Sequence, residues 1–197
     1  MRLPDVVTHI QGSPGRLGSS RLVCIDGRAG AGKSDYADEL AGAWSAATSI
    51  ASTTLHMDDL YEGWGGLPEV AEVVSSMLME PWNNGRDARP AAWDWGARRR
   101  GAPTSLPLTP LVILEGVGSY ARRYGDLVTT VIWLECPDPV RRSRALARDG
   151  AVFAPHWDRW ARDEVRVHTR EDTRARADVT VYSALERPSA VVGPVLP

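Results

Sequence analysis

The stretch Arg21-Leu-Val-Cys-Ile-Asp-Gly-Arg-Ala-Gly-Ala-Gly-Lys-Ser34 decides the fold of this 197-residue chain. Residues 21–25 are apolar after Arg21 and are followed by glycines, which predicts a short buried strand. The run rich in Ala, Glu and Leu up to residue 44 predicts a helix. Between them, eight consecutive residues match the motif G-x-x-x-x-G-K-[ST] without a mismatch: Gly27, Arg28, Ala29, Gly30, Ala31, Gly32, Lys33 and Ser34.

The chemistry of phosphate binding explains this spacing. Glycines let the backbone curl so that successive N–H groups point at phosphate oxygens, and the helix that follows adds its N-terminal dipole. We expect Lys33 to reach the β- and γ-phosphates and the Ser34 hydroxyl to bind Mg²⁺. Lys33 is the only lysine in a chain otherwise rich in arginine, and a compact ammonium fits the phosphate nest better than a planar guanidinium. ATP and Mg²⁺ are therefore the predicted cofactors.

The rest of the chain alternates between strand and helix patterns. Strands are expected at residues 21–25, 53–57, 111–114, 130–134 and 178–181, and helices at residues 5–11, 34–44, 67–79, 138–149 and 157–173. This alternation predicts a single α/β domain over residues 1–197 with a mostly parallel sheet. Residues 80–108 predict an irregular insertion with a hairpin, and the tail after Arg187 is expected to be loosely attached.

Two carboxylates follow predicted strands directly, so they should meet the phosphate loop at one edge of the sheet. Glu115 ends the run Leu111-Val-Ile-Leu114 and fits an acid that holds Mg²⁺ directly or through water. Asp58 ends the second strand and fits a base that accepts the proton of an acceptor hydroxyl, with Asp59 in the following turn. Asp58 is also a candidate to help hold the metal.

Arginines on one predicted helix form a further candidate feature. Arg141, Arg144 and Arg148 lie at positions i, i+3 and i+7 and so share a face. A solvated surface paired with acids would explain such a stripe, but a phosphoryl-transfer enzyme also needs cations around the transferring group. Arg148 precedes the stretch Gly150-Ala-Val-Phe-Ala-Pro155, which we interpret as a lid-like loop, and Asp138 is the expected N-cap of the helix.

Composition and charge exclude several classes of protein. The net charge is −2 and the pI about 6.1, so no nucleic-acid partner is expected. No apolar run approaches the length of a membrane span and no secretory signal is recognisable, which predicts a cytoplasmic protein without a membrane partner. Cys24 and Cys136 read as buried free thiols. A guanine-specific switch would need an Asn/Thr-Lys-x-Asp motif, which the single lysine rules out.

The ordered motifs resemble those of the uridine kinase family of P-loop kinases over residues 20–182. Besides the phosphate loop, the similar segments are Asp58-Asp-Leu-Tyr61, Trp93-Asp-Trp95, Leu114-Glu-Gly116, Arg144 with Arg148-Asp149, and Thr173-Arg-Ala-Arg-Ala-Asp178. The resemblance implies a three-layer P-loop NTPase fold with five parallel strands in the order 2-3-1-4-5 and helices on both faces. It also implies an acceptor-binding insertion at residues 60–108 and a short lid at residues 144–157.

By the same resemblance, Tyr61, Asp94 and Trp95 would bind the acceptor, and Arg144 and Arg148 would be lid cations beside the catalytic pair Asp58 and Lys33. The implied activity moves the γ-phosphoryl group of ATP to a nucleoside such as uridine or cytidine. Shikimate-, gluconate- and pantothenate-type acceptors stay open as alternatives, because no segment of residues 97–110 matches the family's nucleobase-reading segment. A nucleotide-binding protein without catalysis and a homo-oligomer also stay open.

Overall fold

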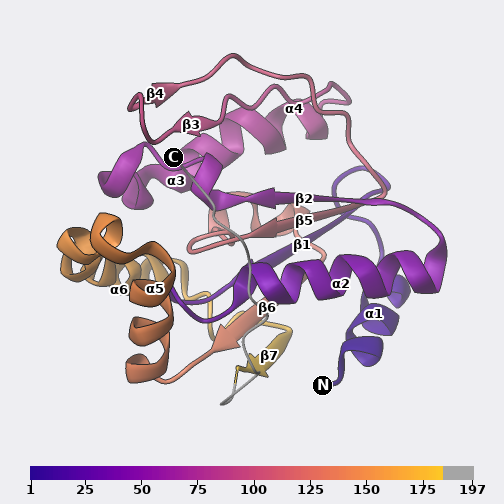
Figure 1. Ribbon diagram of the computed structural model, residues 1–197. Coiled ribbons are helices and arrows are strands. Elements are labelled where there is room, and N and C mark those ends of the chain that lie inside the picture. The colour runs from indigo at the N-terminus through magenta and orange to yellow at the C-terminus, as the bar shows by residue number, and fades with distance from the viewer. Residues whose placement is uncertain (184–197) are drawn as a thin grey trace.

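Five strands form one parallel sheet at the centre of the computed structural model, which describes residues 1–183 (Figure 1). They are β1 (Arg21–Asp26), β2 (Ser52–His56), β5 (Leu111–Glu115), β6 (Thr130–Glu135) and β7 (Val179–Tyr182), in the order β2-β5-β1-β6-β7. Counted along the chain among themselves, this order is 2-3-1-4-5, so the predicted topology is confirmed. The tail after Arg187 lies outside the described residues.

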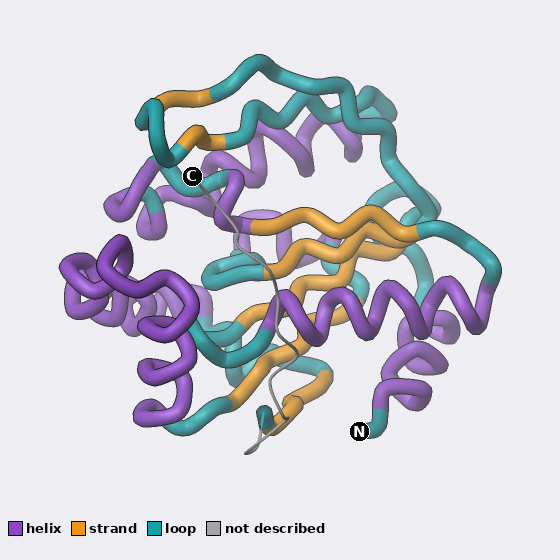
Figure 2. The backbone as a smooth tube through the Cα atoms, viewed as in Figure 1, coloured by secondary structure: helices purple, strands orange, loops and turns teal. Residues whose placement is uncertain are grey.

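Helices cover both faces of the sheet, as expected for strands that are apolar on both sides. α1 (Leu3–Gly12) and α2 (Lys33–Thr48) pack on one face, against alternate strand residues such as Val23 and Ile25. The remaining helices pack on the other face, against Leu22, Cys24 and Leu114. The backbone trace in Figure 2 shows the sheet between these two layers. Both cysteines are buried and free, which confirms that prediction.

The chain after β2 forms a composite helix and a hairpin. The short helical turns η1 (Met57–Asp59), η2 (Gly63–Gly65) and η3 (Leu67–Glu69) lead into α3 (Val70–Val74), the π-helical turn η4 (Ser75–Met79) and α4 (Glu80–Asn83). The wide π turn directly precedes Pro81, which has no N–H to donate to the preceding turn. β3 (Trp93–Asp94) and β4 (Arg99–Arg100) then pair antiparallel, so the insertion contains the predicted hairpin.

The predicted lid differs from a loop. After η5 (Arg122–Leu127), β6 is followed by α5 (Asp138–Phe153), η6 (Ala154–His156) and α6 (Trp157–Glu171). The segment expected to be a loop is thus helical, with one break at Gly150, where φ is 51° and ψ is −131°. It is folded because Phe153 is buried against the aromatic rings of Trp64 and Trp157.

The start of α5 also corrects the sequence prediction. Pro137 is the N-cap of α5, so Asp138 is its first residue, and the Asp138 carboxylate instead pairs with arginines. Among the described residues, no helix is long and apolar enough to cross a membrane.

Candidate active site

The phosphate loop turns sharply between β1 and α2, and two of its glycines are needed for that turn. Gly27 has φ 145° and Gly30 has φ 78°, conformations that L side chains rarely adopt. A Cβ at Gly30 would collide with the carbonyl oxygen of Arg141, and one at Gly27 would lie 2.5 Å from the carbonyl oxygen of Leu134. The loop therefore packs backbone to backbone against β6 and α5.

Lys33 is the first residue of α2 and is almost fully buried under the loop. Its Nζ donates a hydrogen bond of 3.2 Å to the carbonyl oxygen of Arg28, at the start of the loop. This contact holds the ammonium group across the concave side of the loop, where phosphate oxygens would replace the carbonyl as partners. Phosphate binding by Lys33 stays a prediction.

Ser34, Glu115 and His56 meet at the edge of the sheet. The Ser34 hydroxyl donates to Glu115 Oε1 at 3.0 Å, and His56 Nδ1 lies 2.6 Å from the same oxygen. Burial opposes ionisation of Glu115, but the hydrogen bond from His56 and the charge of Lys33 outweigh it, so the pKa of Glu115 is lowered. The hydrogen bond to Glu115 raises the pKa of His56.

The donor set of this cluster fits Mg²⁺. A hydroxyl and an ionised carboxylate are the hard oxygen ligands that Mg²⁺ prefers, and the ion usually takes only one or two carboxylates and completes its shell with phosphates and water. No group of three or more His, Cys, Asp or Glu side chains in residues 1–183 could hold a metal by itself. Ser34 and Glu115 would therefore hold Mg²⁺ together with a nucleotide, and a contact from Asp58 stays a prediction.

Asp58 lies in η1, directly after β2, and its side chain is exposed to solvent at the carboxyl end of the sheet. Neighbouring atoms still shield its carboxyl group enough to raise its pKa, an effect that the positive charge of Arg148 and then Lys33 reduces and that Glu115 reinforces. These four charged groups therefore act on one another, as expected from strand ends that converge. The indole N–H of Trp95 donates to the Asp58 carbonyl at 3.1 Å and attaches the hairpin to this turn.

The two predicted lid arginines lie in different places. Arg148 forms a two-point ion pair with Asp149, and its pKa is raised first by that hydrogen bond and further by the charges of Asp58 and Glu115. Arg144 instead donates to the Ser183 hydroxyl at 2.8 Å. That hydroxyl is 3.7 Å from the point where a Cβ at Gly32 would lie, so Arg144 is at the other end of the phosphate loop.

The residues expected to bind the acceptor are only partly in position to do so. Tyr61 is 1% exposed and its hydroxyl donates to the Val117 carbonyl at 2.7 Å, so it belongs to the core rather than to an open pocket. One oxygen of Asp94 accepts the Ala97 N–H at 2.8 Å and closes the hairpin turn. Trp95 contacts the Asp58 turn as described. Acceptor binding by Asp94 and Trp95 stays a prediction.

The sequence analysis missed a buried ionic network behind the phosphate loop. Glu164 of α6 is fully buried, and its carboxylate accepts the Ala29 N–H at 2.6 Å. The same carboxylate lies 3.4 Å from the Arg28 guanidinium and 3.5 Å from that of Arg141, which is itself 3% exposed. Arg141 is thus a structural partner of the loop and not a surface cation. A signal existed, because Glu164 lies on the helical stripe of buried residues Trp157, Trp160, Val167 and Glu171.

Asp26 is a second buried carboxylate that the sequence analysis did not single out. It ends β1 and accepts the backbone N–H groups of Gly27 at 2.7 Å and Gly118 at 2.9 Å. His168 of α6 lies 3.1 Å from the same oxygen. Asp26 therefore ties the start of the phosphate loop to the segment that follows Glu115, which fixes the two halves of the site relative to each other.

Comparisons with known proteins agree with this geometry at the level of the fold. A solved structure from Bacillus stearothermophilus, provisionally described as a uridine kinase, matches 90% of this chain and 96% of its own, with 17% identity and a TM-score of 0.65. A structure from Silicibacter sp. TM1040, provisionally described as a fructose transport system kinase, matches 92% and 99%, with 21% identity and a TM-score of 0.63. No protein-family model and no curated protein matches the chain.

The fold and the phosphate loop together define a protein of the P-loop class. The two similar structures share its architecture, which confirms the expected fold. At these identities the likeness does not extend to a substrate.

Proposed function

We propose that this protein is a phosphotransferase that moves the γ-phosphoryl group of ATP to a hydroxyl group of a small metabolite. The observation that carries the proposal is the register of β2 and β5, which pairs His56 with Glu115 and so places Asp58 two residues beyond the strand end that faces Ser34. A protein that only bound nucleotide would need the phosphate loop but no second carboxylate at this edge of the sheet. The partner is a small acceptor and not a nucleic acid, given the acidic balance of the chain.

Each charged or polar group at this edge of the sheet has a role that follows from its place. The loop N–H groups and Lys33 bind the phosphates, and Ser34 and Glu115 would hold Mg²⁺, which neutralises charge on the phosphate oxygens when bound. Asp58 accepts the proton of the acceptor hydroxyl as the hydroxyl oxygen attacks the γ-phosphorus, the bond from that phosphorus to the β,γ-bridging oxygen breaks, and ADP leaves. Arg148 lies on the side of Asp58 and is the lid cation assigned to the transferring group, whereas Arg144 contacts the nucleotide side of the loop.

A nucleoside is the first candidate acceptor, as in the family that the motifs resemble, and sugar acids, shikimate-type rings and pantothenate-type alcohols are the alternatives. The test is ADP release from ATP and Mg²⁺ with each acceptor, measured above the rate without acceptor. We expect at least one acceptor to raise ADP release and the Asp58→Asn variant to lose that increase while it still binds ATP. If Asp58→Asn keeps normal turnover on a confirmed acceptor, the assignment of the base is wrong. If no acceptor raises ADP release and ATP still binds, the protein binds nucleotide without this catalysis.

A further inference from the structure

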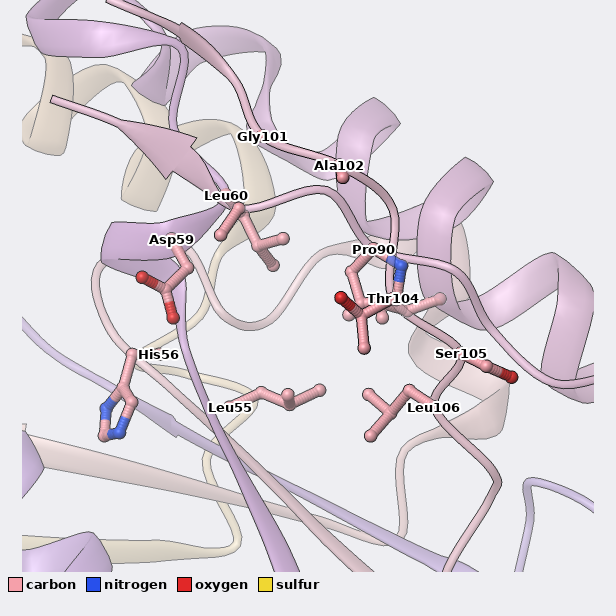
Figure 3. A pocket seen from close by; sticks show the side chains of 12 residues that line it. Leu55, His56, Asp59, Leu60, Pro90, Gly101, Ala102, Thr104, Ser105 and Leu106 are labelled. Atoms are coloured by element: carbon pink, nitrogen blue, oxygen red, sulfur yellow. The ribbon is translucent and has the colours of Figure 1, made fainter. Parts of the chain in front are cut away.

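A cavity of about 270 Å³ lies between the edge strand β2 and the insertion, beside the Asp58 turn (Figure 3). Its lining is mostly apolar and comes from three separate parts of the chain. It includes four leucines and two polar side chains: Leu55, Leu60, Leu78, Leu106, His56 and Asp59. This volume suits one small organic group and is too small for a macromolecular segment.

Hydrogen bonds to backbone groups of the insertion hold the walls of the cavity together. Arg100 of β4 donates to the carbonyl oxygens of Leu60 at 2.8 Å and Ala91 at 3.0 Å, so it joins the two sides of the cavity. Ala88 and Leu106 form an antiparallel bridge farther along the same two segments. These contacts make the cavity a preformed feature of the fold.

The cavity lies next to the proposed base. His56 and Asp59 line it, and Asp58 lies between them in the sequence. Figure 3 shows both side chains on the same side of the cavity, with the leucines and Pro90 around the remaining space. A molecule that fills the cavity would therefore present its nearest polar atoms to the Asp58 turn.

The charge of the lining selects against anions. Asp59 is the one carboxylate among the lining residues, all of which are described, and none of them is lysine or arginine. His56 is held by Glu115 at 2.6 Å. Arg100 is engaged by backbone carbonyls and by Glu62 at 3.3 Å, so its guanidinium is not available to a ligand. Any positive charge on His56 is paired with Glu115, so a carboxylate placed here would face Asp59 without an unpaired cation.

We propose that this cavity receives the apolar body of the phosphoryl acceptor and that the acceptor carries no negative charge. Asp59 accepts a hydrogen bond from a hydroxyl or amine of the acceptor at the mouth of the cavity, beside the hydroxyl that Asp58 deprotonates. The inference rests on the proposed function and narrows it. It removes shikimate-, gluconate- and pantothenate-type acids from the candidate acceptors and leaves uncharged or amine-bearing alcohols.

The first test measures the charge selectivity without any acceptor. Because Cys24 and Cys136 are buried, a Thr104→Cys variant carries one accessible thiol at the cavity. Its alkylation rates with neutral iodoacetamide and anionic iodoacetate are compared with those of Ser45→Cys, an exposed site on α2. Any shift in the pKa of the thiol affects both reagents equally, so the ratio of rates reports the field in the cavity.

At low salt we expect the ratio of the iodoacetamide rate to the iodoacetate rate to be at least about threefold higher at position 104 than at position 45. Adding Asp59→Asn to the Thr104→Cys protein should make the two ratios nearly equal. An equal ratio at the two sites, or an excess that survives Asp59→Asn, overturns the inference. Wild-type protein treated with the same two reagents is the control for reaction at the buried Cys24 and Cys136.

The second test uses acceptors that differ by one carboxylate: uridine and orotidine, panthenol and pantothenate, glucitol and gluconate. For any pair that raises ADP release, we expect the neutral member to have at least about a tenfold higher kcat/KM, and Asp59→Asn to narrow the gap. A preference for the anionic member overturns the inference and leaves the kinase proposal intact. If the alkylation ratio is as expected but no acceptor works, the cavity selects by charge and the proposed function fails for these acceptors.

Discussion

Removal of the Glu164 carboxylate should weaken both the fold and the phosphate loop. In Glu164→Ala the Ala29 N–H loses its acceptor at 2.6 Å, and the buried Arg141 loses an anion at 3.5 Å. Breaking a buried ion pair from one side typically costs about 3–5 kcal/mol. Arg141 keeps Asp138 at 2.8 Å, so we take the lower end, about 3 kcal/mol. For a chain of this size that corresponds to a fall in Tm of about 6–12 °C.

The functional part of the same prediction is a weaker affinity for ATP. Arg28 and Ala29 lose their anchor on α6, so the loop N–H groups are less well ordered before the phosphates arrive. Glu164→Gln keeps an oxygen that can accept the Ala29 N–H but removes the charge, so we expect roughly half the loss of stability. Tm is measured by scanning calorimetry and the Kd for ATP with Mg²⁺ by titration calorimetry.

A matched control removes the same charge from an exposed position of the same helix. Asp158→Asn lies in the first turn of α6 and should change Tm and Kd little. The reasoning is refuted if Glu164→Ala stays within about 1 °C of the wild type with an unchanged Kd. A large fall in Tm with an unchanged Kd would show that Glu164 supports the core and does not position the loop.

Other residues of the site give further predictions. Asp58→Asn should lower acceptor-dependent turnover by about 10²–10⁴-fold. The same variant should have a higher Tm at pH 7. The pKa of Asp58 is higher in the native state than in the unfolded chain, so the ionised carboxylate lowers the stability of the wild type at this pH. Wild-type turnover should fall, in a pH–rate profile, as pH drops through that raised pKa, at a higher pH than for an ordinary aspartate. Gly30→Ala should abolish ATP binding in a titration, because the new Cβ would collide with the Arg141 carbonyl. Gly42→Ala is the control, because a Cβ at Gly42 of α2 would meet open space. It should raise the free energy of unfolding by about 0.4–1 kcal/mol in urea denaturation. Arg148→Ala should lower kcat, measured by steady-state kinetics, more than it weakens ATP binding, measured by titration. Arg144→Ala should weaken ATP binding more than it lowers kcat.

The sequence alone determined the parts of the site that depend on short stretches of chain. The phosphate loop needs glycines at fixed positions, one lysine and one hydroxyl, all within eight residues, so the pattern is readable without a structure. Asp58 and Glu115 each follow an apolar strand directly, and parallel strands bring their carboxyl ends to one edge. The hairpin in the insertion was also predicted correctly, and so was the strand order, which the family resemblance implied.

Tertiary structure decided which charged side chains are buried and which space is left open. Arg141 and Arg148 have the same helical periodicity, yet Arg141 is buried against Glu164 of α6, whereas Arg148 pairs with Asp149 and is exposed. The bond from Ala29 to Glu164 spans 135 positions in the sequence, and no local pattern specifies it. The cavity beside Asp59 has the same origin, because three distant segments form its walls. Local motifs therefore specified the phosphate loop, while long-range packing decided how that loop is held and where the cavity beside Asp59 lies.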